Sequence, residues 1–264
     1  MISSNSASRR PGMMDVARLA GVSHQTVSCV LNAMASHQLR TPLTSIKGYL
    51  DMLLQGDLGP VCPTQKAVLR EAFSSSERMV QLINDFLSIS RLQTGTFTMN
   101  RQLANLGDIV QSEMALLKIV AKQRNITLSV HIDDDVPTLP IDAEKLRQVI
   151  MNMTDNAIFY SKEQTTVKVS LCCDTREVVF TVEDQGIGVP KAEQSGVFGK
   201  FFRASNARKR RPDGTGVGLF LARKVVLEHG GSMIFTSKED KGSTFGFRLP
   251  LDRPAVNKKK VTSR

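Results

Sequence analysis

Residues 152–161 read NMTDNAIFYS, and this stretch does most to decide the fold. Asn152 and Asn156 are four residues apart in a segment with helical periodicity, so their side chains share one face of a helix. Amide oxygens suit Mg²⁺, which takes hard oxygen ligands and usually keeps waters and substrate phosphates. The pair therefore predicts a helix that presents a magnesium site.

Two glycine-rich segments supply the other parts of a nucleotide site. Asp184 begins DQGIGVP (184–190), where the strand-like run EVVFTVED (177–184) enters a turn, and its carboxylate can accept a hydrogen bond from the edge of a base. The glycines of GTGVGL (214–219) let backbone N–H groups approach phosphate oxygens at the start of a helix, where the dipole favours anions. A glycine run alone is unspecific, but the three features together predict nucleotide binding.

Three further motifs complete the series: SHQLRTPLTSIKGY (36–49), VFGKFFRA (197–204) and GSTF (242–245). With all the motifs in this order and spacing, residues 33–252 resemble the transmitter of a sensor histidine kinase. The resemblance implies an α+β chain, in which a helical hairpin forms a dimeric four-helix bundle and an α/β sandwich ATP-binding domain follows. It also implies ATP and Mg²⁺ as cofactors. The SHQLRTPL motif disfavours another ATPase of this nucleotide fold, such as a chaperone or topoisomerase relative.

The spacing of apolar and small residues supports the helical hairpin independently. Two seams repeat at alternating four- and three-residue spacing: Leu39, Leu43, Ile46, Leu50 and Leu53, then Leu69, Phe73, Ser76, Val80, Ile83, Leu87 and Ser90. Between them, QGDLGPVCP (55–63) contains the glycines and prolines that interrupt helices. With one seam per helix a single hairpin cannot bury both faces, so we expect two copies to form a four-helix bundle.

Beyond Gly95 the pattern changes to alternating strands and helices. We expect strands at 126–132, 166–173, 177–183, 232–237 and 243–249, and helices at 106–123, 142–161 and 216–229. Strands grouped as hairpins, with helices over one face, indicate an α/β sandwich. The expected divisions of the chain are a partial helix-turn-helix-like segment or helical lead-in (1–32), the dimerisation and phosphoacceptor domain (33–95), the ATP-binding domain (96–252) and a basic, disordered tail (253–264).

The chemistry that the resemblance implies begins at His37, which would attack the γ-phosphorus of ATP, because a neutral imidazole is a good nucleophile near pH 7. Gln38 departs from the commoner family pattern, which has Glu or Asp beside the histidine. An amide can orient the imidazole but cannot take its proton. Thr41 matches the position that family members use to position water for dephosphorylating the partner; its alternative role is to fill a helix turn.

In the nucleotide site, Asn156 is the expected metal ligand and Asn152 supports the phosphates or a metal-bound water. The resemblance implies that Asp184 reads the adenine amino group. Arg203 belongs to a basic cluster beside the phosphate turn, so we expect it to face the triphosphate. The remaining expected contacts come from the adenine pocket, the turn and a mobile lid: Tyr160, Lys162, Gly186, Gly188, Gly214, Gly216, Gly218, Leu219 and Thr244.

Composition bounds the class of protein. The chain has 264 residues and a net charge of +10, and no apolar stretch approaches the roughly 20 residues of a membrane helix. The polar start does not resemble a signal peptide, and the four cysteines show neither metal-ligand spacing nor a disulfide framework. We therefore expect a soluble, cytoplasmic homodimer that passes phosphate to a separate response regulator receiver domain, because the chain leaves no room for one.

The start of the chain suggests an alternative function. MMDVARLAGVSHQTVSCVLN (13–32) resembles the helix-turn-helix of lac-repressor-type regulators, in which His24 and Gln25 would reach base edges. Cys29 stands where that family usually has an arginine that contacts DNA, and the third helix that completes the small domain is missing. A two-helix fragment buries too little surface to fold alone. A DNA-binding regulator with the kinase fold as its dimerisation scaffold is therefore the less favoured alternative.

Overall fold

The computed structural model describes residues 41–212 and 214–251. The chain divides after Thr98 into two compact units, and each is described by itself. His37, Gln38, the N-terminal segment (1–32) and the basic tail (253–264) lie outside the described residues.

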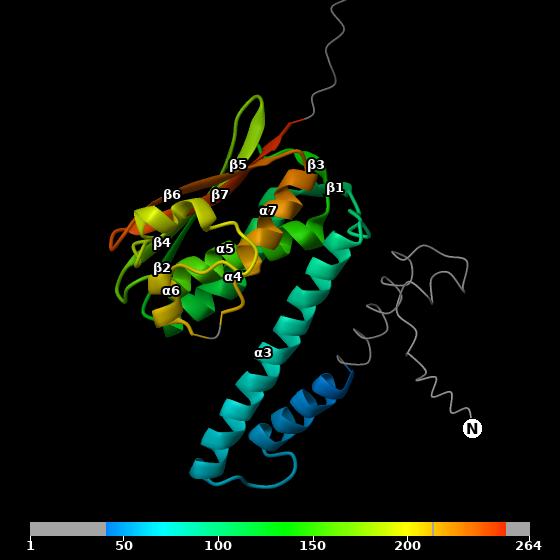
Figure 1. Cartoon of the computed structure of the whole chain (residues 1–264), viewed down its shortest axis with the longest axis vertical. Helices are drawn as coiled ribbons and strands as arrows, with labels where there is room; N and C mark the ends of the chain where they lie inside the picture. Colours follow the sequence, from blue (N-terminus) through cyan, green and yellow to red (C-terminus); the bar gives the residue numbers. More distant parts are fainter. Residues whose placement is uncertain (1–40, 213, 252–264) are drawn as a thin grey trace, which may run out of the picture. The chain divides into compact units, whose positions relative to one another are not determined.

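The first unit is a helical hairpin, as the apolar spacing predicted (Figure 1). Residues 41–55 are helical, and α3 (Pro63–Gln93) follows after a turn. The start of α3 is fixed locally: the backbone N–H of Cys62 donates to Oε1 of Gln65 over 3.0 Å. Pro63 stands in the first helical turn, where its missing N–H needs no partner within the helix.

The predicted seams are the protected faces of the two helices. Among the described members, all are buried or half-buried except Ile46. The helices also contact each other through Lys47, whose ammonium lies 2.7 Å from the Glu77 carboxylate and 5.2 Å from the centroid of the Phe73 ring. The hairpin therefore closes along the predicted seams.

Each helix also carries a second apolar surface, so the expectation of one seam per helix is wrong. We call this surface the outer stripe; its members are Tyr49, Met52, Val68, Met79, Leu82 and Phe86, all exposed. Met79, Leu82 and Phe86 follow one another at spacings of three and four residues, which places them on one face of α3. The sequence pattern missed this stripe because polar residues interrupt it more often than they interrupt the seams.

The second unit is built on a five-stranded sheet. Its strands, in spatial order, are β2 (Thr127–Ile132), β4 (Thr166–Cys173), β5 (Glu177–Glu183), β7 (Gly242–Pro250) and β6 (Ser232–Lys238). β2 runs parallel to β4, and the other neighbours are antiparallel. β4 and β5 have the predicted bounds, β2 and β6 differ from prediction by one residue at one end, and β7 is one residue longer at each end.

Three helices cover one face of this sheet: α4 (Leu106–Gln123), α5 (Ala143–Tyr160) and α7 (Gly218–Glu228) (Figure 1). Alternate residues of β4 and β5 are buried, as expected for strands with one face on a core. At the centre of that core, Phe180 stacks on Phe247 with ring centroids 5.2 Å apart. This confirms the predicted helical hairpin followed by an α/β sandwich.

Four short elements were not predicted. β1 (Gln102–Asn105) pairs with β3 (Thr138–Ile141) in a separate antiparallel ribbon. A 3₁₀ helix, η1 (Lys191–Gly196), and the helix α6 (Ser205–Arg210) lie between β5 and α7 in the sequence. Each is too short for apolar periodicity to be read reliably.

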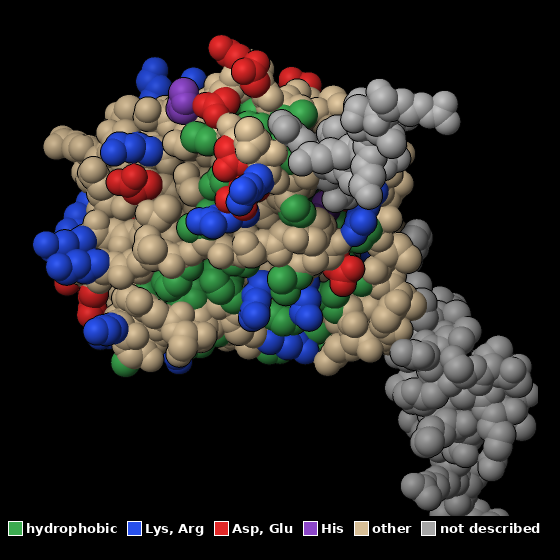
Figure 2. All heavy atoms as spheres, turned by 90° about the horizontal axis from the view of Figure 1, so that it is seen from above, with side chains coloured by type: hydrophobic (Ala, Val, Ile, Leu, Met, Phe, Trp, Pro, Cys, Tyr) green, Lys and Arg blue, Asp and Glu red, His purple; other side chains and the backbone are tan. Residues whose placement is uncertain are grey.

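The surface carries both signs of charge. On the face drawn in Figure 2, lysine and arginine side chains are separated by acidic side chains and neutral surface. The net charge of +10 therefore does not form one continuous basic patch on that face. Within 41–212 and 214–251, the helices are all too short or too polar to cross a membrane.

Candidate functional site

Asn152 and Asn156 lie on one face of α5, as their spacing predicted. Nδ2 of Asn156 donates to Oδ1 of Asn152 over 3.2 Å, which leaves Oδ1 of Asn156 as an acceptor for a cation. Nδ2 of Asn152 is buried and has no hydrogen-bond partner among the described residues. A buried donor without a partner costs free energy, so this site fits a ligand that accepts a hydrogen bond there, such as a phosphate oxygen.

Asp184 is buried just beyond the end of β5, and backbone N–H groups hold its carboxylate. Its Oδ1 accepts hydrogen bonds from the N–H of Gly186 at 2.8 Å and of Ser243 at 3.2 Å. Burial raises the pKa of Asp184 to about 6, although both hydrogen bonds favour the charged form. The carboxylate is therefore mostly ionised at neutral pH and can accept a hydrogen bond from a buried donor.

The turn after Asp184 requires glycine at two positions. Gly188 has φ of +59°, and a Cβ there would lie 2.1 Å from the carbonyl oxygen of Lys238. A Cβ at Gly186 would lie 2.4 Å from the carbonyl oxygen of Tyr160, the last residue of α5. The turn therefore packs directly on the end of the helix that carries the asparagines.

The second glycine segment meets the same helix. Gly218 is the first residue of α7, and a Cβ there would lie 2.6 Å from Nδ2 of Asn152. Gly216 has φ of +70°, with its Cβ position 2.8 Å from the carbonyl oxygen of Phe202. The N-terminus of α7, where the helix dipole favours an anion, thus lies beside the asparagine pair. The segments predicted to bind a metal ion, the base and the phosphates thus all pack against α5 or its end.

We call residues 197–212 and 214–217 the lid. Within it, the guanidinium of Arg203 donates to the carbonyl oxygen of Pro212 at 2.8 Å and to that of Arg211. The same guanidinium is 3.0 Å from the position that a Cβ at Gly214 would occupy. Arg203 therefore organises the backbone of the lid, and its expected role toward the triphosphate stays a prediction.

Arg211 anchors the lid to α5 through contacts that the sequence did not predict. Its Nη1 lies 3.6 Å from Oδ2 of Asp155, and its guanidinium carbon lies 4.6 Å from the centroid of the Phe159 ring. The guanidinium carbon of Arg124 lies 4.3 Å from the same centroid. Such cation–π contacts stabilise by about 0.5–1 kcal/mol each at exposed sites.

Leu219 and the lid phenylalanines form an apolar cluster. Its members are Val189, Val197, Phe198, Phe202, Ala204, Ala207, Leu219, Phe235 and Phe245. Phe198 meets Phe235 and Phe245 edge-on, with centroids 6.0 and 6.4 Å apart. Phe201 is 60% exposed instead. The cluster therefore holds the lid on the sheet.

The other predicted site residues occupy varied settings. Tyr160 is half-buried, with its ring edge-on to Phe159 at 5.2 Å between centroids, and Lys162 is exposed on the loop that follows α5. Thr244 is half-buried on β7, opposite Glu183. In the hairpin, Thr41 is exposed, and its carbonyl oxygen accepts a hydrogen bond from the Ser45 hydroxyl at 3.2 Å.

A polar connection at the other end of α7 was missed. Nε2 of His229 accepts the N–H of Asp142 at 2.9 Å, and Nδ1 of His229 lies 2.7 Å from the carbonyl oxygen of Val225. Together these bonds require a neutral imidazole with its proton on Nδ1, and burial lowers the pKa of His229. Asp142 also caps α5, since its Oδ1 accepts the N–H of Lys145 at 3.1 Å. Both ends of α7 are therefore tied to α5.

Two family models match the chain in the order of its units. Residues 30–95 match the His Kinase A (phospho-acceptor) domain, and residues 141–253 match the histidine kinase-, DNA gyrase B- and HSP90-like ATPase family. Together these regions form a histidine kinase transmitter. Residues 12–38 also match the lacI family of bacterial regulatory proteins, in agreement with the predicted resemblance, but they lie outside the described residues.

The chain is similar to curated histidine kinases and sensory kinases. It is 33% identical over 225 residues to the sensor histidine kinase WalK of Bacillus subtilis, covering 83% of this chain and 36% of WalK. It is 31% identical to the circadian input-output histidine kinase CikA of Synechococcus elongatus, covering 83% and 29%. The adaptive-response sensory kinase SasA of Synechococcus sp. is 35% identical, with 84% and 59% covered. The chain thus spans about a third of the first two relatives.

Solved structures of histidine kinases share the fold of the transmitter. Full-length ShkA in complex with AMPPNP superimposes with a TM-score of 0.68 at 23% identity, over 83% of this chain and 45% of ShkA. The catalytic domain of ThkA gives a TM-score of 0.51 at 25% identity, over 58% of this chain and 96% of that chain. These likenesses confirm the α+β fold class.

Proposed function

We propose that the transmitter is an ATP-dependent protein histidine kinase of a two-component system. It would phosphorylate itself on His37 and pass the phosphoryl group to an aspartate on the receiver domain of a separate response regulator. One observation carries the proposal: Asn152 of α5 packs against Gly218, and the end of the same helix packs against the turn that follows Asp184, in a chain that also contains SHQLRTPL. Three distant segments with complementary nucleotide chemistry meet at one place, and the two family matches support the same reaction.

The nucleotide contacts follow from the donors and acceptors of the site. Asp184 would accept a hydrogen bond from the adenine amino group, since its carboxylate is buried and ionised at neutral pH. The unpartnered Nδ2 of Asn152 and the backbone N–H groups at Gly216 and Gly218 would donate to phosphate oxygens. The free Oδ1 of Asn156 fits Mg²⁺, which neutralises phosphate charge when bound.

The remaining predicted contacts have secondary roles in this proposal. The ring of Tyr160 would line the adenine pocket, and the ammonium of Lys162 would approach the phosphates. Thr244, in register with Glu183 just before Asp184, would bind a water on the adenine side. These three assignments rest on the resemblance, so they need individual tests by substitution.

His37 is the proposed nucleophile. A neutral imidazole nitrogen would attack the γ-phosphorus in line, forming an N–P bond while the bond to the bridging oxygen breaks and ADP leaves. The ring proton would pass to solvent, because the amide of Gln38 can orient the imidazole but cannot accept its proton. The hydroxyl of Thr41 would position a water for dephosphorylating the partner.

The decisive test is labelling with [γ-³²P]ATP. Wild type should give an acid-labile, base-stable phosphoprotein, which is the behaviour of a phosphohistidine. His37→Ala and Asn156→Ala should both abolish the label, the first by removing the acceptor and the second by removing a metal ligand. His24→Ala, a second histidine within the N-terminal segment, is the matched control and should label normally. Equal labelling of wild type and His37→Ala would refute the proposal.

We also infer that the transmitter is a homodimer. Met79, Leu82 and Phe86 of the outer stripe are 49%, 51% and 64% exposed, and covering such side chains is favourable by about 25 cal/mol per Å². A second hairpin would cover them and complete a four-helix bundle. Leu82→Glu should give monomers in analytical ultracentrifugation. Leu103→Glu, at an exposed leucine of the ATP-binding domain, is the control and should remain dimeric; a dimeric Leu82→Glu would place the interface elsewhere.

The cytoplasm is the proposed compartment of the reaction. All three described cysteines, Cys62, Cys172 and Cys173, are free thiols. Free thiols are typical of a reducing compartment, and ATP is available there. Cell fractionation followed by labelling of the soluble fraction would test the assignment.

A second candidate function, DNA binding, rests on the lacI-family match at residues 12–38. We propose that this segment is not an independent DNA reader, because Cys29 replaces the expected arginine and the third helix is missing. Deletion of residues 1–30 should leave autophosphorylation largely intact. Gel shifts with genomic fragments supply the other measurement: nanomolar, sequence-specific binding at physiological salt, lost on this deletion, would contradict the proposal.

A further inference from the structure

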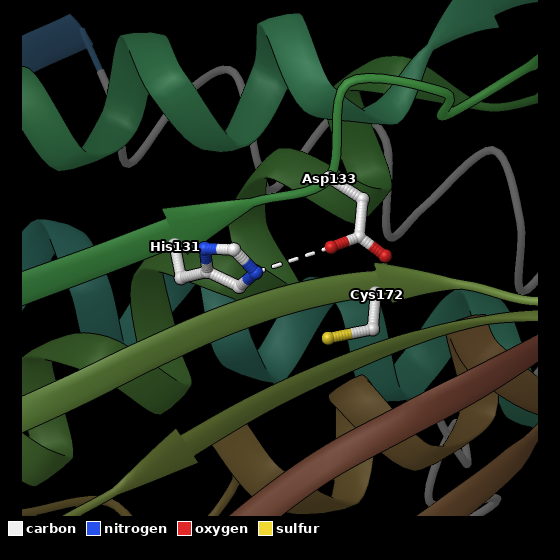
Figure 3. Close-up of side chains that lie close together, drawn as sticks. All are labelled: His131, Asp133 and Cys172. Carbon is white, nitrogen blue, oxygen red and sulfur yellow. Dashed lines mark ion pairs between the residues drawn. The ribbon is translucent and has the colours of Figure 1, made fainter.

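Three side chains with metal-ligand chemistry meet on the edge of the sheet (Figure 3). His131 lies on β2, Asp133 follows that strand, and Cys172 lies on the neighbouring strand β4. Their ligand atoms, one from each side chain, all lie within 4.8 Å of one another. Cys172 pairs with Val179, at the far end of β5 from Asp184, so this cluster belongs to a different part of the sheet from the nucleotide site.

The parallel register of β2 and β4 creates the cluster. His131 lies opposite Ser170, and the N–H of Asp133 donates to the carbonyl oxygen of Leu171 over 2.9 Å, which extends the ladder by one residue. Residues two apart on a strand point to the same face. His131, Asp133 and Cys172 therefore emerge side by side on the face of the sheet away from the helices.

The carboxylate of Asp133 is already oriented for a ligand. Its Oδ2 accepts the backbone N–H of Cys173 at 2.8 Å, while its Oδ1 lies 3.1 Å from Nε2 of His131. A hydrogen bond from outside the cluster fixes a ligating group in the way that metal sites require. The half-buried Asp133 thus presents one oxygen toward the imidazole and the thiol.

These distances fit a small tetrahedral ion. Zinc takes nitrogen and oxygen ligands at about 2.0–2.2 Å and sulfur at about 2.3 Å, which separates the ligand atoms by about 3.3–3.6 Å. The 3.1 Å between His131 and Asp133 is close to that separation, and the thiol needs a movement on the order of 1 Å. A surface ion pair accounts for His131 and Asp133 but not for the adjoining thiol.

We propose that His131, Asp133 and Cys172 bind a divalent transition-metal ion of the zinc class, with water as the fourth ligand. Thiolate and imidazole ligands favour such ions over Mg²⁺ and Ca²⁺, which take oxygen ligands. The ion would cross-link β2, an edge strand, to β4. It would therefore stabilise the ATP-binding domain from outside the nucleotide site.

Binding at this site is coupled to a proton. A cysteine thiol has an ordinary pKa of about 8.5, so the metal-free thiol is mostly protonated at neutral pH. A metal ion binds the thiolate and must displace that proton. Binding should therefore release a proton and weaken as the pH falls.

The test is a Co²⁺ titration of the full chain, in a Cys29→Ser, Cys62→Ser background that removes the thiols outside β4. One Co²⁺ ion per chain should produce a thiolate-to-cobalt absorption band, which Zn²⁺ displaces and excess Mg²⁺ does not. Cys172→Ser should abolish the band, and His131→Ala and Asp133→Asn should each weaken binding by at least about tenfold. Cys173→Ser is the matched control, because it removes a neighbouring thiol and keeps the N–H that orients Asp133.

Thermal unfolding checks that the variants fold. Without metal, Cys172→Ser should unfold at the temperature of its parent; with Zn²⁺, only the parent should show a raised unfolding temperature. Absence of the thiolate band in the parent, or a band that survives in Cys172→Ser, overturns the proposal. So does a zinc-dependent rise in unfolding temperature that is equal in the parent and in Cys172→Ser.

Discussion

Asn152 and Gly218 touch across two helices, with the side-chain amide of the asparagine filling the space that a Cβ on the glycine would need. Asn152 belongs to the asparagine pair of α5, and Gly218 begins α7. The rotamer of the asparagine, and with it the direction of its unpartnered Nδ2, therefore depends on a residue that has no side chain. The contact joins two separate sequence motifs by packing.

The first prediction concerns this contact. Gly218→Ala should push the amide of Asn152 aside, weaken Mg-ATP binding and destabilise the domain by about 1–3 kcal/mol, the usual cost of an overpacked core. Calorimetric titration with ATP and urea unfolding measure the two effects. Gly48→Ala is the matched control, because a Cβ at Gly48 meets nothing within 4 Å.

A double variant tests the cause. Asn152→Ala should relieve the overlap, so Asn152→Ala with Gly218→Ala should be more stable than the sum of the single effects indicates. Strict additivity of the unfolding free energies would show that the two side chains are not coupled.

The second prediction concerns the charge of Asp184. Asp184→Asn should weaken ATP binding by roughly 1.5–3 kcal/mol, the contribution of a hydrogen bond to a charged group. Because the pKa of Asp184 is raised to about 6, the wild-type affinity should be complete above that pH and fall below it, as the carboxylate is protonated. The difference between wild type and Asp184→Asn isolates this carboxylate from the titration of ATP itself. A difference that does not change with pH would contradict the base-reading role.

The third prediction concerns Gln38, whose amide cannot act as a base. Gln38→Glu should raise the single-turnover phosphorylation rate at saturating ATP. General acid–base assistance is typically worth about 10²–10⁴-fold, but an imidazole that is already oriented should gain less, so we expect about tenfold. The ATP dissociation constant should hardly change. An unchanged rate across neutral pH would mean that another group takes the proton or that a domain motion limits turnover.

The fourth prediction concerns His229 and the pH dependence of stability. Its folded-state pKa is lowered by burial, so the neutral form contributes stability that is present above the ordinary histidine pKa of about 6.5. That contribution is lost as the pH falls through the lowered folded-state pKa, because only the unfolded chain takes up the proton readily. The free energy of unfolding of wild type should therefore decrease over this range. His229→Ala should show a flatter profile, and parallel profiles would exclude His229 as the cause.

Apolar periodicity was sufficient to predict the three long helices and the five-stranded sheet of the ATP-binding domain, but not its four short elements. β4, β5 and α4 have the predicted bounds because each buries one face against the core, and burial imposes a period of two or about 3.6 residues. The convergence of Asn152, Asp184 and the glycine segment was also predicted. Paired asparagines, an aspartate before a glycine turn and a second glycine segment are residue types that helix and strand formation alone would not select, so they could be recognised in the sequence.

Contacts between distant residues could not be predicted in the same way. His131 and Cys172 meet only because β2 and β4 pair in parallel, and nothing in their sequence spacing indicates it. The bond from Asp142 to His229 likewise joins elements that are far apart in the chain. The outer stripe of the hairpin was missed because polar residues interrupt its spacing, and its residues are exposed in a single chain.

The charged contacts around the Phe159 ring should make opening of the lid depend on ionic strength. Arg211 reaches its ring from the lid and Arg124 from the end of α4, and Arg211 also pairs with the partly exposed Asp155. Attraction between exposed charges is screened over about 10 Å at 0.1 M salt and over shorter distances as salt increases. The lid should thus release more readily in concentrated salt, and ADP should leave faster, which stopped-flow displacement of a fluorescent ADP analogue can time. In Arg211→Gln the rate of ADP dissociation should depend much less on salt concentration. The residence time of bound ADP would then be set largely by the single guanidinium of Arg211.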